Sequence, residues 1–361
     1  MSQFNYLFRS LSLGLTLMAV ACTGDSKPLK NWDIEDSRPA TKQLVRDDAM
    51  RCAFQDSRGR MWFGTNNEGL FRYDGHRFVN FSRENGLCSN TINDIIEDRN
   101  GNLWLGTPRG LCKYDGEEFT QIDIPWSDTS SVWLDQVYPV INPNEVHCLL
   151  EDNKGKLWIG TGGAGVYAYY GEEFVQHLRD RGMVYDDSLH HNWITSITED
   201  RNGSIWITSM SLGAVSVFKD GKWTFLDRED GLSDNMVRVG YEDRDGNMWF
   251  GSNGNREGGL DRFDGSSFEN FKESDGLCSA NTRTIYQDAK GNMWLGSGRG
   301  GLCLYDGNSF TEIKDSDGSS FDSIFFILGD SKGQIWFGGN YGKLYRYDGE
   351  KVIDMTKSAR M

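Results

Sequence analysis

Short apolar runs alternate with glycine-rich polar segments along most of this chain. In the stretch 90–123 this alternation predicts four β-strands, at 91–98, 102–107, 110–115 and 118–123. An Asp-Gly pair between the last two strands is a strong local signal for a β-hairpin. The stretch therefore predicts a four-stranded antiparallel meander.

The same unit recurs seven times, and a tryptophan in its second strand marks each copy. These tryptophans are Trp62, Trp104, Trp158, Trp206, Trp249, Trp294 and Trp336. Each follows an aspartate by six residues and a glycine by three, as Trp104 follows Asp98 and Gly101. Asp-x-x-Gly predicts a turn, because aspartate can hydrogen-bond the turn backbone and glycine accepts a positive φ. A period of about 44 residues with four strands is typical of propeller blades.

Seven units between residues 48 and 355 predict an all-β fold, a single seven-bladed β-propeller of four-stranded antiparallel blades. One such sheet could not bury both faces alone, whereas blades stacked in a ring form a continuous core. We expect the tryptophans to pack between blades. All units are complete in one frame, so no blade is predicted to mix strands from both ends of the chain. Residues 32–47 could supply an extra edge strand, and 356–361 are a C-terminal tail.

The first 21 residues have the pattern of a signal peptide. Arg9 precedes an apolar run at 11–21 that is too short to span a bilayer as a helix. The stretch 19–22 resembles a bacterial lipobox, which implies lipidation of Cys22, an exported lipoprotein and a position on the periplasmic side of the membrane or at the cell surface. A plain signal peptide that is cut nearby is the alternative. Residues 22–47 are polar and are predicted to be a tether.

The charge of the chain argues against one class of partner, nucleic acids. The chain has 38 Lys and Arg against 53 Asp and Glu, a formal net charge of −15, and no basic run. Because nucleic-acid binding needs positive charge to release counterions from phosphates, we expect no nucleic-acid partner.

Four of the seven cysteines form two pairs with similar spacing. Cys88 and Cys112 flank the second unit, and Cys278 and Cys303 flank the sixth. We predict two disulfides, Cys88 to Cys112 and Cys278 to Cys303, since an exported chain meets an oxidising environment. Four buried thiols, placed by duplication of the repeat, are the alternative. The cysteines at 52 and 148 are predicted to be small core residues.

The motif I-x-E-D-x-x-G-x-L-W-x-G-T, followed by G-L-x-x-Y-D-G and F-x-x-F, resembles the two-component regulator propeller repeat. In that family the repeat builds the periplasmic sensor region of hybrid histidine kinases, which implies ligands derived from polysaccharides. The family motif is scaffold and implies no catalytic residues. Because six residues follow position 355, we expect no kinase or DNA-binding domain. The repeat is more distantly similar to streptogramin lyase propellers, whose chemistry uses a histidine, acidic residues and a metal ion.

Two long crossings between units carry aromatic residues that could form a ledge for sugar stacking or partner docking. They are Trp126, Trp133, Tyr138, His190 and Trp193. The alternative is that these side chains pin their own loops to the blade edge.

The residues five positions before each turn aspartate form a second candidate site. They are Arg51, Asn93, His147, Thr195, Arg238, Arg283 and Phe325. Around a central channel they would form a ring, and Arg109, Arg256 and Arg299 from nearby loops would add positive charge. Such a cationic mouth suits carboxylated or sulfated ligands through bidentate guanidinium bonds. The alternative is that these residues pair with Asp48, Asp94 and Asp322.

Signals for an enzyme are few. The five histidines stand in no metalloprotease, nucleophile-elbow or phosphate-loop pattern, and neither a metal nor another cofactor is predicted. The leading interpretation is a lipid-anchored propeller without catalysis that binds a glycan or a protein partner in extracytoplasmic sensing or handling of glycans. The competing interpretation is a lyase-like enzyme that uses His147 or His190 with nearby acids.

Overall fold

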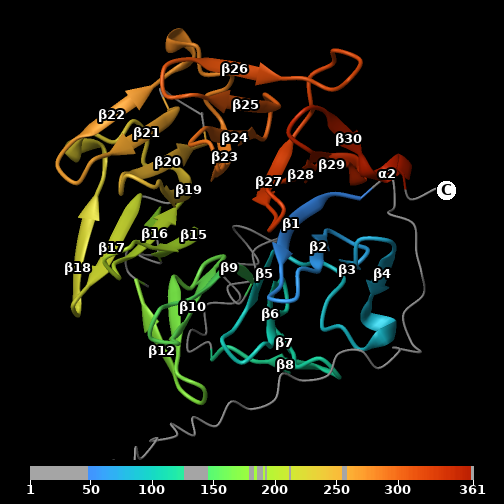
Figure 1. Ribbon diagram of the computed structural model, residues 1–361. Helices are drawn as coiled ribbons and strands as arrows, with labels where there is room; N and C mark the ends of the chain where they lie inside the picture. The colour runs from blue at the N-terminus through green and yellow to red at the C-terminus, as the bar shows by residue number, and fades with distance from the viewer. Residues whose placement is uncertain are drawn as a thin grey trace, which may run out of the picture. The chain divides into compact units, whose positions relative to one another are not determined.

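A computed structural model describes residues 48–125, 145–178, 193–210, 213–253 and 258–358, and the backbone alone at 183–184, 190–191 and 357–358. The strands at 50–354 make a seven-bladed β-propeller, in which each blade is a four-stranded antiparallel sheet of consecutive strands. In Figure 1 the first strand of each blade lies near the centre and the last lies at the periphery. The predicted fold class and blade number are confirmed.

Equivalent strands have similar lengths in all blades. The first strands are β1 (Met50–Gln55), β5 (Asp94–Glu97), β9 (Val146–Glu151), β15 (Ile194–Glu199), β19 (Val237–Glu242), β23 (Thr282–Gln287) and β27 (Ile324–Gly329). The second strands are β2 (Met61–Thr65), β6 (Leu103–Thr107), β10 (Leu157–Thr161), β16 (Ile205–Ser209), β20 (Met248–Ser252), β24 (Met293–Ser297) and β28 (Ile335–Gly339). The third strands are β3 (Leu70–Tyr73), β7 (Gly110–Tyr114), β11 (Val166–Tyr169), β17 (Val215–Lys219), β21 (Leu260–Phe263), β25 (Leu302–Tyr305) and β29 (Leu344–Tyr347).

The outer strands and the connections complete the ring. The outer strands are β4 (Phe78–Phe81), β8 (Phe119–Ile122), β12 (Phe174–His177), β18 (Lys222–Leu226), β22 (Phe268–Phe271), β26 (Phe310–Ile313) and β30 (Val352–Asp354). The connections hold the hairpin of β13 (Met183–Val184) and β14 (His190–His191), the 3₁₀ turns η1 (Arg83–Asn85), η3 (Arg228–Asp230), η4 (Glu273–Asp275) and η5 (Asn340–Gly342), and the C-terminal helix α2 (Met355–Ser358).

The turn between the first and second strands has the same geometry in every blade. In the second blade, Asp98 Oδ1 accepts backbone N–H bonds from Asn100 and Asn102, and Gly101 has a φ of 77°. The other carboxylate oxygen accepts the indole N–H of Trp104 at 2.9 Å, a bond that the sequence did not predict. All seven tryptophan indoles donate to their turn aspartate in this way. The repeated aspartate therefore anchors both the turn and the tryptophan.

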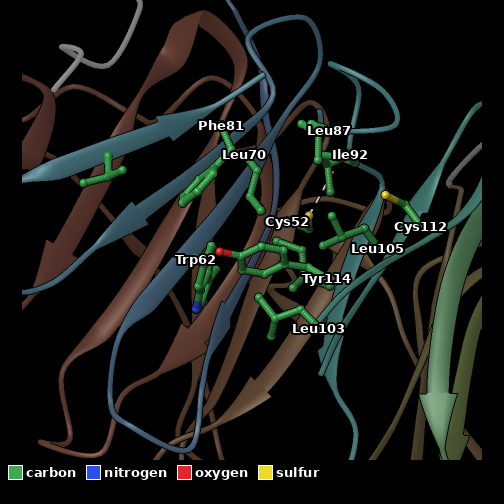
Figure 2. Packing of buried hydrophobic residues seen from close by; sticks show 12 residues of the cluster. Cys52, Trp62, Leu70, Phe81, Leu87, Ile92, Leu103, Leu105, Cys112 and Tyr114 are labelled. Carbon is green, nitrogen blue, oxygen red and sulfur yellow. Dashed lines mark hydrogen bonds between the residues drawn. The ribbon is translucent and has the colours of Figure 1, made fainter. Parts of the chain in front are cut away.

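The hydrophobic core lies between adjacent blades, as expected. Figure 2 shows the cluster between the first two blades, where Trp62 points toward Tyr114 and Leu103 of the next blade. Trp62 is fully buried, and its ring centroid lies 6.3 Å from that of Tyr114. Six similar clusters fill the other junctions. Burial of an indole stabilises such a junction by about 2 kcal/mol or more.

A polar contact also links neighbouring blades at the turn. The residue that precedes the aspartate in one blade accepts the backbone N–H of the turn in the preceding blade, as Glu151 does from Arg99 at 2.9 Å. Arg99 Nε donates to the same carboxylate at 3.0 Å. Gly329 occupies this position in the seventh blade and has no side chain to accept such a bond. The Glu-Asp pair of the repeat thus serves two blades at once.

The ring closes by side-chain packing, without exchange of a strand among the described sheets. The first blade is β1 to β4 and the seventh is β27 to β30, and β1 lies against β27 (Figure 1). Gln55 Oε1 accepts the backbone N–H of Ser331 at 2.7 Å, and the rings of Phe63 and Trp336 lie 5.7 Å apart. Met355 of α2 is buried in the same cluster. The possible extra strand at 32–47 lies outside the described residues.

Both predicted disulfides are present. Cys88 is bonded to Cys112, and Cys278 is bonded to Cys303, so each bridge ties a crossing loop to a third strand. In the fifth blade the equivalent positions hold Ser233 and Asp261, and the Ser233 hydroxyl donates to Asp261 Oδ2 at 2.8 Å. The cysteines at 52 and 148 are free and buried, as predicted.

Candidate functional site

A cavity of about 580 Å³ lies at the first strands of the blades. Its wall contains all seven residues that precede the turn aspartates by five positions, namely Arg51, Asn93, His147, Thr195, Arg238, Arg283 and Phe325. Glu145, Gly162 and Trp193 complete the wall. The structure therefore brings together the ring that was predicted by counting along the repeat, and what the ring binds stays a prediction.

A β-bulge positions six of these seven side chains. In β1, Met50 pairs with Thr65 and Cys52 pairs with Gly64, so Arg51 is the extra residue of the bulge. The ring residues of β9, β15, β19, β23 and β27 occupy the same position. Asn93 directly precedes β5. Because a bulge leaves one residue outside the regular pairing, it can turn that side chain toward the cavity while its neighbours stay in the core.

Three arginines lie on one side of the ring, in the fifth, sixth and first blades. Arg238 Nε donates to Asn253 at 2.6 Å, and Arg51 Nη1 donates to Asn66 at 2.8 Å. The Arg283 guanidinium lies over the Phe325 ring at 4.5 Å. A Cβ at residue 298 would meet Arg283 Cδ at 2.7 Å, so Gly298 leaves room for this side chain.

These arginines have no carboxylate partner among the residues that the structure describes. Burial, with the neighbouring charges of Arg283 and Arg299, lowers the pKa of Arg238 to about 10. Burial and the charge of Arg51 lower the pKa of Arg283 as well. The described wall therefore holds three arginines against a single carboxylate, that of Glu145, and its net charge is positive.

The predicted alternative, in which the ring is paired with nearby aspartates, is wrong for two of the three acids. Asp48 accepts the backbone N–H groups of Asn67 at 2.7 Å and Glu68 at 2.9 Å. Asp94 accepts the backbone N–H groups of Ile95 and Leu149. Burial raises the pKa of Asp94 to about 7, although these two hydrogen bonds lower it. Both aspartates cap backbone groups instead of neutralising arginines.

The opposite side of the ring, in the second to fourth blades, is built around His147. The Trp193 indole N–H lies 2.6 Å from His147 Nδ1, and His147 Nε2 lies 3.4 Å from Glu145 Oε1. An indole N–H can only donate, so Nδ1 is the acceptor and the imidazole proton is on Nε2. With that proton placement, the contact of 3.3 Å between Nδ1 and the Ile194 carbonyl is not a hydrogen bond. Both ring nitrogens therefore face protein partners.

Glu145 is the only acid in the described wall of this cavity, and the sequence reasoning missed it. Burial raises its pKa, but the hydrogen bond and the electrostatic interaction with His147, a hydrogen bond from Asn93 and the charge of Arg51 outweigh that effect and lower the pKa below its ordinary value. Glu145 is therefore ionised at neutral pH. It precedes His147 by two residues, as Trp193 precedes Thr195, so a search at this position of the repeat could have found both.

The remaining predicted site residues lie elsewhere. Arg109 is exposed and outside the cavity wall, and Arg299 is exposed beside a second cavity of about 540 Å³. Trp126, Trp133, Tyr138 and Arg256 lie outside the described residues, as does the lipidation candidate Cys22. Only the backbone of His190 is described, in β14. The aromatic ledge therefore stays a prediction, apart from Trp193, which lines the cavity.

Within the described ranges, no group of three or more histidine, cysteine, aspartate or glutamate side chains is placed to hold a metal ion. No helix among the same residues is long and apolar enough to cross a membrane.

Six segments of the chain match the family described as two component regulator propeller. They are residues 45–67, 86–109, 141–163, 188–211, 231–254 and 276–299. These segments cover the first two strands of six blades, and the seventh copy, around Trp336, lies outside them.

The curated protein "Histidine kinase P4" of Formosa agariphila is 27% identical to this chain over 182 residues, which are 48% of this chain and 12% of the kinase. The chain thus aligns with about an eighth of that relative's length.

Two solved structures share the fold at low identity. An extracellular domain of a B. thetaiotaomicron protein described as a hybrid two-component system has a TM-score of 0.64 at 22% identity, over 84% of this chain and 39% of that one. A streptogramin B lyase has a TM-score of 0.64 at 13% identity, over 87% of this chain and 97% of the lyase. Both likenesses concern the fold alone.

Proposed function

This chain carries the repeats of the two-component regulator propeller family, and from that premise we propose that it is an exported ligand-binding propeller without catalytic activity of its own. It is anchored by lipid on Cys22 and acts in the sensing or handling of extracellular glycans. The observation that carries this proposal is the central cavity, where three arginines converge with no carboxylate partner among the described residues. A solved structure with the same fold, an extracellular domain of a hybrid two-component system, supports an extracellular setting.

The cavity has the size and chemistry of a small-molecule site. Its volume of about 580 Å³ is within the range of ligand pockets. Guanidinium groups bind carboxylate and sulfate oxygens through pairs of parallel hydrogen bonds, and Asn66 and Asn253 already orient two of them. Burial and the charges of Arg283 and Arg299 lower the pKa of Arg238, and an anionic ligand would offset both effects. We therefore expect acidic glycans to bind in preference to neutral ones.

A catalytic role of the lyase type has less support. His147 is the histidine of the cavity wall, and both of its nitrogens face protein partners, Trp193 and Glu145. A general base must present a free nitrogen to the proton that it removes. His147 thus orients Glu145 instead of facing a substrate.

A glycan array probed with the full chain in detergent tests the proposal. We expect retention on carboxylated or sulfated glycans, little on neutral ones, and loss with Arg283→Gln. Arg109→Gln is the matched control, since this arginine is exposed and outside the cavity wall. Equal retention of neutral glycans, or an Arg283→Gln variant that binds as wild type, would contradict the proposal. A turnover that His147→Ala abolishes would favour the lyase.

Two separate experiments address the ledge and the anchor. Replacement of both Trp126 and Trp133 by alanine is expected to weaken retention on the same array or in a pull-down, and unchanged retention would remove the ledge from the proposal. Cys22→Ser is expected to move the protein from the detergent phase to the aqueous phase in a Triton X-114 partition. A variant that still enters the detergent phase would show that lipid on Cys22 is not the anchor.

A further inference from the structure

The cavity wall consists of two unlike halves. Arg238, Arg283 and Arg51 lie in the fifth, sixth and first blades. Asn93 and Glu145 lie in the second and third blades, on the other side of the ring. One half therefore offers hydrogen-bond donors with positive charge, and the other offers carboxylate and amide oxygens as acceptors.

Two oxygen atoms of the acceptor half receive no hydrogen bond from a described residue. Asn93 Nδ2 donates to Glu145 Oε1 at 3.0 Å and to the Val146 carbonyl at 2.9 Å. These two bonds fix the orientation of the amide and leave Asn93 Oδ1 buried with no partner. Glu145 Oε2 also receives no hydrogen bond from any described residue, since the contacts of this carboxylate are made by Oε1. A buried acceptor without a donor costs about 1–3 kcal/mol, so a ligand that donates there gains affinity.

No lysine or arginine among the described residues lies within ion-pair distance of the Glu145 carboxylate. His147 Nε2 lies 3.4 Å from Glu145 Oε1, while its Nδ1 accepts the indole N–H of Trp193. A carboxylate that is largely shielded from water and has no lysine or arginine partner attracts a positively charged group more strongly than a hydroxyl.

We infer that the cavity binds a small zwitterion, with its anionic group on Arg238 and Arg283 and its ammonium group on Glu145 and Asn93. This inference rests on the proposed function, because it assigns the ligand class of the same cavity. Two sources share that chemistry, namely a short peptide or amino acid with free ends, and a sugar acid that carries an unmodified amine. A ligand with only the anionic group would leave the acceptors of Glu145 and Asn93 unsatisfied.

Matched probes that differ by one charged group test the inference by isothermal titration calorimetry on the full chain. The peptide arm uses Ala-Ala, N-acetyl-Ala-Ala and Ala-Ala amide. The sugar arm uses glucosaminate, gluconate and glucosamine. In the arm that corresponds to the natural source, we expect the zwitterion to bind about tenfold more tightly than either singly charged analogue, the factor for one charge-assisted hydrogen bond.

Two variants assign each charge to its half of the wall. Glu145→Gln is expected to make the zwitterion and the anion-only analogue bind equally, while Arg238→Gln is expected to weaken both by about tenfold. Glu117→Gln is the control, since Glu117 is exposed and outside the cavity wall. Near-ultraviolet circular dichroism checks that each variant keeps its tertiary packing.

The outcomes separate this inference from the proposed function. If the anion-only analogue binds as tightly as the zwitterion and Arg238→Gln weakens both, the anionic site stands and the zwitterion is wrong. If Glu145→Gln leaves the preference for the zwitterion unchanged, the assigned ammonium site is wrong. If no probe binds at millimolar concentration in either arm, both the inference and the anionic ligand of the proposed function are contradicted.

Discussion

The two ends of the first strands in this propeller carry opposite kinds of residue. At the turn end, all seven blades have an aspartate that accepts the indole N–H of its own tryptophan. Five residues earlier, at the cavity end, the blades present arginine, asparagine, histidine, threonine and phenylalanine. The aspartates that repeat close their hydrogen bonds within the protein, whereas at the variable position Asn93 leaves an oxygen without a donor and three arginines have no carboxylate partner among the described residues. Repetition therefore marks the scaffold, and disagreement between copies marks the site.

The largest expected effect tests the turn end. Asp243 is buried and accepts hydrogen bonds from the backbone of Asp245 and Asn247 and from the Trp249 indole. Asp243→Ala leaves these donors unpaired, so we expect a loss of about 3 kcal/mol in the free energy of unfolding, measured by urea denaturation. Asp245→Ala is the matched control in the same turn, since Asp245 is exposed.

Hydrogen bonds to the ionised form outweigh burial and lower the pKa of Asp243. Its contribution to stability is therefore present above the ordinary aspartate pKa of 3.8 and is lost as the pH falls through the lower folded-state value. A loss for Asp243→Ala no larger than that for Asp245→Ala would show that the hydrogen bonds of the turn aspartate do not stabilise the fold.

At the cavity end, loss of a ring side chain is expected to stabilise the fold. Arg238→Gln removes a charge that burial and neighbouring arginines disfavour, so the free energy of unfolding is expected to rise by about 1 kcal/mol. The gain should be constant between pH 6 and 9, because arginine is protonated there in both the folded and the unfolded protein. Arg109→Gln, outside the cavity wall, is expected to change stability little. Destabilisation by Arg238→Gln as large as that by Asp243→Ala would make the cavity end scaffold as well.

The sequence predicts the repeated end almost completely and the variable end only in part. The period of the tryptophans gives the blade number, and Asp-x-x-Gly gives the turn. Counting back from the aspartate also finds the ring around Arg51. Strict strand alternation does not say where Arg51 points, since that direction depends on a β-bulge.

Long-range contacts are the other part that the sequence does not reveal. The bond between Gln55 and Ser331, which closes the ring, joins residues 276 positions apart, and no local pattern encodes it. The free oxygen of Asn93 is likewise visible only once the position of Glu145 is known.

The contact between the crossing loop and the third strand is the same in some blades and different in others. The second and sixth blades have a disulfide there, whereas the fifth has Asp261 with Ser233. Asp261 is fully buried, and Asn270 donates to its other oxygen at 2.6 Å. Burial raises its pKa to about 6, although hydrogen bonds from Asn270 and Ser233 lower it. In the fifth blade this hydrogen-bonded pair therefore joins the crossing loop to the third strand, as the disulfides do in theirs, but the strength of the pair depends on pH.

The smallest expected effect follows from that pKa. A carboxyl with a folded-state pKa of about 6 and an ordinary value of 3.8 binds its proton more tightly in the folded protein, so its ionisation destabilises the fold as the pH rises through that window. Asp261→Asn, which cannot ionise, should be more stable than wild type by about 1 kcal/mol at pH 7.5 and no more stable at pH 4. Asp264→Asn is the control, since this aspartate is exposed. If the difference in stability between Asp261→Asn and wild type is the same at both pH values, ionisation of Asp261 does not destabilise the folded protein. The loop contact of the fifth blade would then be as independent of pH as the disulfides.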